Sequence, residues 1–228
     1  MVKLRSLALV LALVLGAGCP GAKVEGAPGA ASAATPPSVT AAASASATAP
    51  SAAPSSSPSA ASSAARPARW AEPVARPGLP NLHRVDEGFY RGAQPTAEGI
   101  PELGKLGVRT VVNLRAMHSD RSLLAGQSLD YEHISFKAWH PEKSDVVAFL
   151  RIATDRARQP FFLHCQHGAD RTGMMTAIYR IIVQGWSKDD AIAEMVEGGF
   201  GFHAVWQNLV EYVRDLDVAS LARAAGLA

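Results

Sequence analysis

Residues 161–173 have the sequence FFLHCQHGADRTG, an apolar run that ends in a cysteine, then a short polar stretch, then an arginine. The apolar residues at 161–163 have high β-propensity and follow Pro160, which predicts a buried strand. From Arg171 to Gly185 the apolar side chains recur at helical spacing, at Met174, Ile178, Ile181 and Ile182. The segment between Cys165 and Arg171 is therefore predicted to be a strand-to-helix loop.

A loop of this kind favours anions. Its backbone N–H groups, and those of the first helical turn, have no intrahelical partner and can point together at one ligand, while the helix dipole adds partial positive charge. Gly168 stands where the loop must curl tightly. We predict a phosphate site formed by Gln166, His167, Gly168, Ala169, Asp170 and Arg171.

Cys165 lies inside this predicted site, where the thiolate is favoured over the thiol, so it is a candidate nucleophile. Arg171 can offer a planar fork of donors to two phosphate oxygens. The hydroxyl of Thr172 could donate to the cysteine sulfur. The alternatives are a buried structural cysteine and an ordinary surface arginine, but the helix dipole disfavours a cation at a helix start unless an anion joins it.

The spacing His-Cys-five residues-Arg-Thr resembles the signature loop of the cysteine-dependent protein tyrosine and dual-specificity phosphatases. The segment YRGAQP at 90–95 is similar to the opening segment of their bacterial and plant-fungal dual-specificity-like members. The resemblance covers about residues 82–213. It implies an α/β fold with a mostly parallel central sheet of about four or five strands, helices on both faces, and the phosphate loop between a central strand and a helix.

The resemblance also implies phosphomonoester hydrolysis through a cysteinyl-phosphate on Cys165, with no metal and no cofactor. The expected partner is a phosphorylated protein or a small phosphorylated substrate. Three alternatives stay open: a phosphate-recognising pseudophosphatase module, a phosphoinositide phosphatase, and a rhodanese-like sulfur carrier, which also uses a cysteine in a cup-shaped loop. Turnover of p-nitrophenyl phosphate distinguishes the enzyme from the binding module.

The general acid is the least determined residue. The resembled phosphatases carry an aspartate on a mobile loop before the helix that leads to the catalytic strand, but the corresponding segment KAWHPEKSD at 137–145 has no Asp beside Trp139. The nearby substitutes are His140, Glu142 and Asp145. Asp170 lies in a Gly-x-Asp-Arg-Thr pattern similar to that of myotubularin-type and some secreted bacterial phosphatases, where the loop aspartate has been proposed as the acid. We predict Asp170; the alternative role is a brace that accepts backbone N–H bonds.

The N-terminal segment 1–18 has two basic residues, an apolar run and small residues, the pattern of a secretory signal peptide. The run is too short for a membrane span. Cys19 follows LGAG, which is similar to a bacterial lipoprotein processing site, although Gly16 occupies the position where leucine is usual. We expect an extracytoplasmic lipoprotein, periplasmic or on the outer surface, anchored to the membrane through Cys19; the alternative is a plain cleaved signal.

Composition divides the rest of the chain. Residues 19–78 are almost entirely Ala, Ser, Pro, Thr and Gly, which predicts a disordered tether. Residues 79–216 form a domain of normal size, and 217–228 are a tail. In 79–216, 15 Lys and Arg oppose 17 Asp and Glu, a net charge of −2, which excludes a general nucleic-acid surface. Only Cys19 and Cys165 are present, so if Cys19 is lipidated or removed, no disulfide can form within the mature chain.

Other segments carry local predictions. Residues 79–94 are expected to contain a hairpin around Asp86, 109–114 and 131–136 to be strands, and 122–127 to be a short helix. Polar residues follow the strand at 109–114, at the edge where ligands gather in open α/β sheets. There Arg115 could touch substrate or pair with Asp120. His203 is expected to cap the closing helix; the alternative is that it reaches the pocket.

Overall fold

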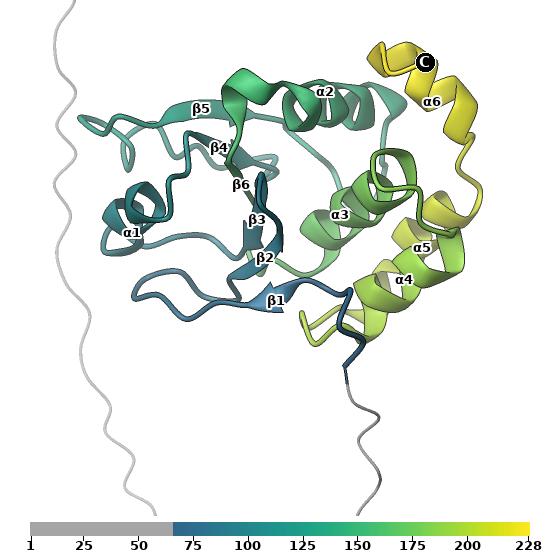
Figure 1. Cartoon of the computed structure of the whole chain (residues 1–228), viewed down its shortest axis with the longest axis horizontal. Helices are drawn as coiled ribbons and strands as arrows, with labels where there is room; N and C mark the ends of the chain where they lie inside the picture. Colours follow the sequence, from purple (N-terminus) through teal and green to yellow (C-terminus); the bar gives the residue numbers. More distant parts are fainter. Residues whose placement is uncertain (1–65) are drawn as a thin grey trace, which may run out of the picture. The chain divides into compact units, whose positions relative to one another are not determined.

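The computed structural model describes residues 66–228, which form a six-stranded sheet with helices on both faces (Figure 1). The strand order is β1-β2-β3-β6-β4-β5. Strands β3, β6, β4 and β5 are parallel, and β1 and β2 continue the sheet in antiparallel pairing. The strands are β1 (Glu72–Pro73), β2 (His83–Asp86), β3 (Phe89–Gly92), β4 (Thr110–Asn113), β5 (Asp130–His133) and β6 (Phe161–His164).

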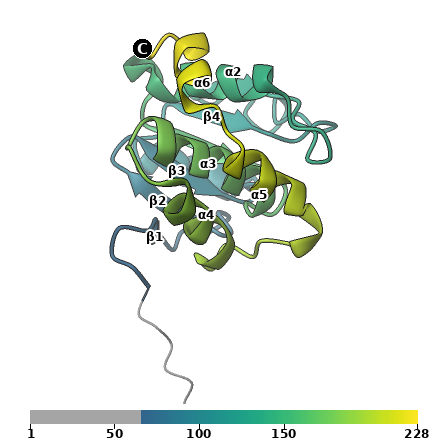
Figure 2. The same cartoon turned by 90° about the vertical axis from the view of Figure 1, so that its right-hand side faces the viewer.

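The helices divide unequally between the two faces. Helix α1 (Gly99–Lys105) covers one face, and the remaining helices cover the other, as Figures 1 and 2 show. The second group consists of α2 (Lys143–Thr154), α3 (Asp170–Ile182), α4 (Lys188–Glu197), α5 (Gln207–Arg214) and α6 (Val218–Ala225), with short 3-10 turns η1 (Arg156–Arg158) and η2 (Ala204–Trp206). Within residues 66–228, no helix is long and apolar enough to cross a membrane.

Strand β6 is the centre of the sheet and carries the site. All four of its residues are fully buried, since β3 and β4 flank it and helices cover both faces. Phe161 and Leu163 belong to the core cluster under α2 and α3, whereas Phe162 belongs to the cluster under α1. This alternation fixes the register of the strand, so its carboxyl end delivers Cys165 to the edge of the sheet.

The mostly parallel α/β fold is confirmed, and so are the hairpin and the strands at the predicted places. The sheet has six strands instead of four or five, because the two-residue strand β1 lies in the segment expected to be tether. Residues 122–127 form turns instead of a helix. The predicted signal peptide, Cys19 and most of the predicted tether lie outside the described residues.

The folded part is wider than the predicted 79–216 at both ends. Ala71 is buried, and its N–H donates to the Glu194 carboxylate at 2.6 Å. At the other end, the predicted tail forms α6, which buries Leu221 and Ala225 against the core. Apolar residues spaced one helical turn apart account for α6, and the Asp217 side chain caps it by accepting from the Ser220 N–H at 2.9 Å.

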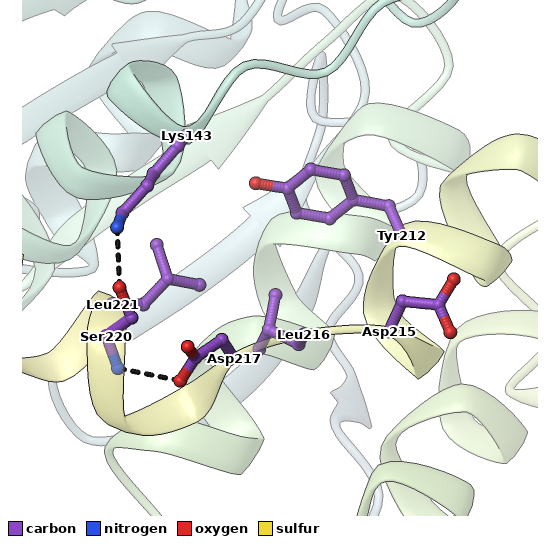
Figure 3. A pocket seen from close by; sticks show the side chains of 7 residues that line it. All are labelled: Lys143, Tyr212, Asp215, Leu216, Asp217, Ser220 and Leu221. Carbon is purple, nitrogen blue, oxygen red and sulfur yellow. Dashed lines mark hydrogen bonds between the residues drawn. The ribbon is translucent and has the colours of Figure 1, made fainter.

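Helix α6 also forms one wall of a pocket of about 310 Å³ with α5 and the start of α2 (Figure 3). Lys143 Nζ donates to Ser220 Oγ at 2.7 Å across its rim, and Tyr212 and Leu216 line it. None of the predicted site residues lines this pocket. It reflects how α6 packs on the domain.

Candidate active site

Cys165 lies at the end of β6, and the loop that follows curls back tightly over the end of β3. Gly168 has a φ of 70°, in the left-handed region, and a Cβ built on it would lie 2.4–2.6 Å from backbone atoms of Gly92 and Ala93. Only glycine fits both constraints. The loop can therefore approach the β3 backbone closely, which confirms the tight curl predicted at this position.

The loop's carbonyl groups are held from outside the loop. The Gln94 N–H donates to the Gln166 carbonyl at 3.2 Å, and Asn81 Nδ2 donates to the His167 carbonyl at 2.9 Å. An Arg91 nitrogen donates to the Gly168 carbonyl at 2.7 Å.

The loop's N–H groups are left free by this arrangement. The Ala169 carbonyl accepts from the Gly173 N–H at 2.7 Å, inside the first turn of α3. Within residues 66–228, no hydrogen bond uses the backbone N–H groups of 166–169. Carbonyls turned outward and N–H groups left free make a cup that suits an anion.

Arg91 is the buried support of this cup. Its side chain is fully buried, it stacks 3.6 Å above the Phe200 ring, and two of its three guanidinium nitrogens have no hydrogen-bond partner within residues 66–228. Burial lowers the pKa of Arg91 to about 10, although the charges of Glu194 and Cys165 act in the opposite direction. Arg91 therefore remains a cation at neutral pH directly beneath the loop.

Arg171 stands at the mouth of the cup. Its side chain is half-buried and makes no hydrogen bond or ion pair inside the described part of the chain. It lines a pocket of about 310 Å³, together with Ala138, Trp139, Gln166, His167, Asp170, His203, Val205 and Trp206. Cys165, which directly precedes Gln166, is almost completely buried, at 1% exposure, and does not line this pocket. The pocket thus joins the predicted phosphate ligands to an apolar and aromatic wall.

The predicted bond from Thr172 to the cysteine sulfur is not present. Thr172 Oγ1 is buried in the first turn of α3 with no hydrogen-bond partner among residues 66–228. A buried hydroxyl without a hydrogen-bond partner costs free energy, and this one is an unused donor at the start of the helix that follows the phosphate loop.

Asp170 and His203 form a pair at the pocket wall. The His203 N–H donates to Asp170 Oδ1 at 2.8 Å, and the His203 ring Nδ1 lies 2.9 Å from Oδ2. The Asp170 side chain is 8% exposed, whereas that of His203 is 48% exposed and lines the pocket. His203 makes no side-chain cap, so the capping role predicted for it is wrong.

The alternative acids lie away from the pocket. Ala138 and Trp139 line it, but His140, Glu142 and Asp145 do not. Burial, followed by the charge of Glu142, raises the pKa of Asp145. A raised pKa suits a general acid, but the Asp145 side chain does not line the pocket. A general acid must first lie within hydrogen-bond reach of the leaving oxygen.

A second network ties the neighbouring strand end to the site. His164 Nε2 lies 2.8 Å from Asp120 Oδ2, Gln94 donates to Asp120 Oδ1 at 2.8 Å, and Arg115 donates to Gln94 at 3.1 Å. Burial alone would raise the pKa of Asp120, but the bond and charge of His164 outweigh it and lower that pKa. Arg115 therefore reaches Asp120 only through Gln94 and does not line the pocket.

The sequence showed no metal-ligand cluster, but the folded chain brings one set together. One ligand atom each from His167, Asp170 and His203 lie within 4.8 Å of one another. The sequence reasoning also missed Asn81, Gln94 and Arg91 as supports of the loop. The segment at 90–95 was singled out only through the resemblance.

Comparisons with known proteins agree with this geometry. The family model described as "DSP-PTPase phosphatase fused to NAD+ Kinase" matches residues 77–210, more than half of the chain. The dual specificity protein phosphatase TpbA of Pseudomonas aeruginosa is 36% identical over 159 residues, which cover 69% of this chain and 72% of that protein.

Two solved structures have the same fold. The crystal structure of a cysteine-to-serine variant of P. aeruginosa TpbA in complex with phosphotyrosine matches with a TM-score of 0.65 and 34% identity, covering 72% of this chain and 99% of that one. The core catalytic domain of the PP-IP phosphatase SIW14 from S. cerevisiae matches with a TM-score of 0.55 and 21% identity, covering 65% and 95%. At that lower identity the second match shows the fold alone.

Proposed function

The chain belongs to the cysteine-dependent protein tyrosine and dual-specificity phosphatase superfamily and is a phosphatase, and from this premise we propose that it hydrolyses phosphotyrosine in proteins. One observation carries the proposal. The loop that directly follows Cys165 has free N–H groups, and it lines an aromatic and apolar pocket together with Arg171, which has no partner within residues 66–228.

The reaction proceeds in two displacements on phosphorus. In the first, the Cys165 thiolate forms the S–P bond while the P–O bond to the tyrosine breaks, and the departing phenolate takes up a proton. In the second, water attacks phosphorus, the S–P bond breaks, and inorganic phosphate leaves with the thiolate restored. Arg171 and the loop N–H groups bind the equatorial oxygens throughout, where the transition state concentrates its charge.

The proton comes from the Asp170 and His203 pair. Asp170 lies in the phosphate loop, and His203 Nδ1 is 2.9 Å from its carboxylate at the wall of the pocket. The Asp170 carboxyl gives its proton to the leaving oxygen, while the more exposed His203 ring lies against that carboxyl and holds it in place. No residue of 140–145 lines the pocket, which supports the predicted choice of Asp170 over that loop.

The wall of the pocket supports an aromatic substrate over an inositol phosphate. Trp139, Val205 and Trp206 line it, whereas Arg171 is its only lysine or arginine among the described residues. A phenyl ring gains by burying its faces against such a wall. An inositol carrying several phosphates would need several cations to replace its lost hydration.

Turnover of a phosphotyrosine peptide, a phosphoserine peptide and an inositol phosphate tests this proposal. We expect the phosphotyrosine peptide to have the highest kcat/KM, and Cys165→Ser to abolish turnover of all three. Absence of turnover of p-nitrophenyl phosphate by the wild type would leave the binding module as the better description. A preference for the inositol phosphate would overturn the substrate assignment.

The acid assignment has its own test. An alkyl phosphate has a poor leaving group and needs protonation, whereas nitrophenolate departs without it. Asp170→Asn and His203→Gln should therefore lower turnover of an alkyl phosphate far more than that of p-nitrophenyl phosphate. The matched controls are His140→Ala, Glu142→Gln and Asp145→Asn. If one of these controls shows the leaving-group dependence instead, the acid lies on the 139–145 loop.

The cell location is a separate proposal. The N-terminal pattern at 1–18 and the small residues before Cys19 support an extracytoplasmic lipoprotein tethered through 19–78. Labelling with a fatty-acid analogue tests it. We expect label on the wild type and none on Cys19→Ala; equal labelling of both, or none on either, would mean a protein without this anchor.

A further inference from the structure

Three metal-ligating side chains converge at the mouth of the pocket from two places in the chain. His167 lies in the phosphate loop and Asp170 three residues later, at the start of α3, while His203 precedes η2. One ligand atom from each lies within 4.8 Å of the other two, and all three side chains line the same pocket. The phosphatase reaction as described uses Asp170 and His203 without a metal, so the convergence of His167 on the same two side chains is not explained by catalysis.

The geometry is close to that of a metal site. With metal-ligand bonds of about 2.1 Å, the ligand atoms of a tetrahedral zinc site lie about 3.4 Å apart. His203 Nδ1 already lies 3.1 and 2.9 Å from the two Asp170 oxygens, and the His167 and His203 ring centroids are 5.3 Å apart. The Asp170 carboxylate is held by the backbone N–H of His203 at 2.8 Å. The His167 and His203 side chains are exposed, so rotation about their side-chain bonds can bring the ring nitrogens to ligand distance.

We propose that His167, Asp170 and His203 bind a zinc ion, which inhibits the enzyme. Two imidazoles and one carboxylate are a ligand set that zinc uses in catalytic sites, while magnesium and calcium prefer oxygen ligands alone. Three protein ligands leave a fourth position open, and all three of these side chains line the pocket that Arg171 also lines.

Bound zinc inhibits by occupancy. It would lie in the pocket that Gln166 and Arg171 of the phosphate loop also line, where it blocks entry of the phosphate ester. This inhibitory half of the inference rests on the proposed phosphatase function. The binding half rests only on the three side chains, and the experiment separates the two.

Binding is measured on the full chain, produced without a polyhistidine tag, by titration with zinc chloride in a calorimeter. We expect one site, and the Cys165→Ser variant should retain it. His203→Gln and His167→Gln should each weaken zinc binding at least about tenfold, because loss of a direct ligand should cost no less than loss of a residue that orients one. The control His140→Gln changes an exposed histidine outside the pocket and should bind zinc like the wild type. Magnesium chloride should give no binding.

Absorption of the cobalt-substituted protein identifies the ligands directly. Nitrogen and oxygen ligands give visible d–d bands without a thiolate charge-transfer band, and this is the expected spectrum. A thiolate band that disappears in Cys165→Ser, or zinc affinity unchanged in both histidine variants, would overturn the site. So would the absence of zinc binding by the wild type.

Inhibition is measured as the ratio of p-nitrophenyl phosphate turnover with and without zinc, within each variant. The ratio should fall strongly for the wild type and His140→Gln, and much less for His167→Gln. Binding at the three side chains without any loss of turnover would overturn the inhibitory role. If the wild type hydrolyses no phosphate ester at all, the proposed function fails while the binding measurements still decide the site.

Discussion

Replacing Gly168 with alanine tests whether the phosphate loop needs its close approach to β3. The added Cβ would lie 2.4 Å from the Gly92 carbonyl carbon and 2.6 Å from the Ala93 nitrogen, where ordinary contacts begin at 3.4 Å. Relief of this overlap needs a shift of about 1 Å, and a misplacement of that size costs about a hundredfold in rate. We therefore expect kcat/KM to fall at least about a hundredfold in Gly168→Ala.

Stability should fall as well. The left-handed φ of 70° costs an alanine about 1–2 kcal/mol, and overlap with fixed backbone adds about 1–3 kcal/mol. The free energy of unfolding should therefore decrease by about 2–5 kcal/mol.

Two glycines serve as matched controls. Gly107 has a φ of 77° with nothing within 4 Å of a built Cβ, so Gly107→Ala isolates the backbone strain, about 1–2 kcal/mol. Gly104 lies in α1 with open space, so Gly104→Ala should be neutral or stabilising by up to about 1 kcal/mol. Urea unfolding and p-nitrophenyl phosphate turnover are measured on all three. The reasoning is refuted if Gly168→Ala matches Gly107→Ala within about 0.5 kcal/mol and keeps wild-type turnover.

Three further predictions concern charged groups. Arg91→Met leaves the Gly168 carbonyl unpaired but also removes a costly buried charge, so the free energy of unfolding should change by less than about 3 kcal/mol. Turnover of p-nitrophenyl phosphate should drop, and unchanged turnover contradicts the role of Arg91 in supporting the loop. Asp120→Asn should destabilise the domain by about 1–3 kcal/mol at neutral pH. The pKa of Asp120 is lowered in the folded state, so its stabilisation is present above the unfolded pKa of about 3.9 and is lost as pH falls through the folded pKa. The difference in free energy of unfolding between wild type and Asp120→Asn, measured in urea, should therefore shrink in acid. A difference that stays constant with pH refutes this reasoning. Arg171→Lys should lose most of kcat/KM because a point charge cannot reproduce a bidentate fork, and near-normal kcat/KM would exclude Arg171 as the phosphate ligand.

Local pattern was enough to predict the centre of the fold. The strand at 161–163, the loop from Cys165 and the helix after it are set by adjacent residues, since apolar periodicity and an uncapped helix start act over a few positions. The supports of the loop depend instead on contacts between distant segments. Arg91 meets Gly168 across 77 positions of sequence, because β3 pairs with β6 in the parallel part of the sheet.

The same reason explains the remaining errors. His203 pairs with Asp170 only because α4 returns the chain to the start of α3, so its role and the cluster with His167 had no local signal. Strand β1 has two residues, which are too few to show a period in the sequence. It forms because its backbone pairs with β2 at the edge of the sheet. Tertiary contacts that decide such short elements cannot be read from composition.

The most direct test is to trap the covalent intermediate. The protein is mixed with a phosphorus-radiolabelled phosphotyrosine peptide and quenched in acid within milliseconds, and peptides from its digest are separated. We predict label on the peptide that contains Cys165, in the wild type and, more abundantly, in any variant whose second displacement is slow; Cys165→Ser should carry none by this route. Steady turnover without label on Cys165, or equal label on Cys165→Ser, would contradict the covalent mechanism.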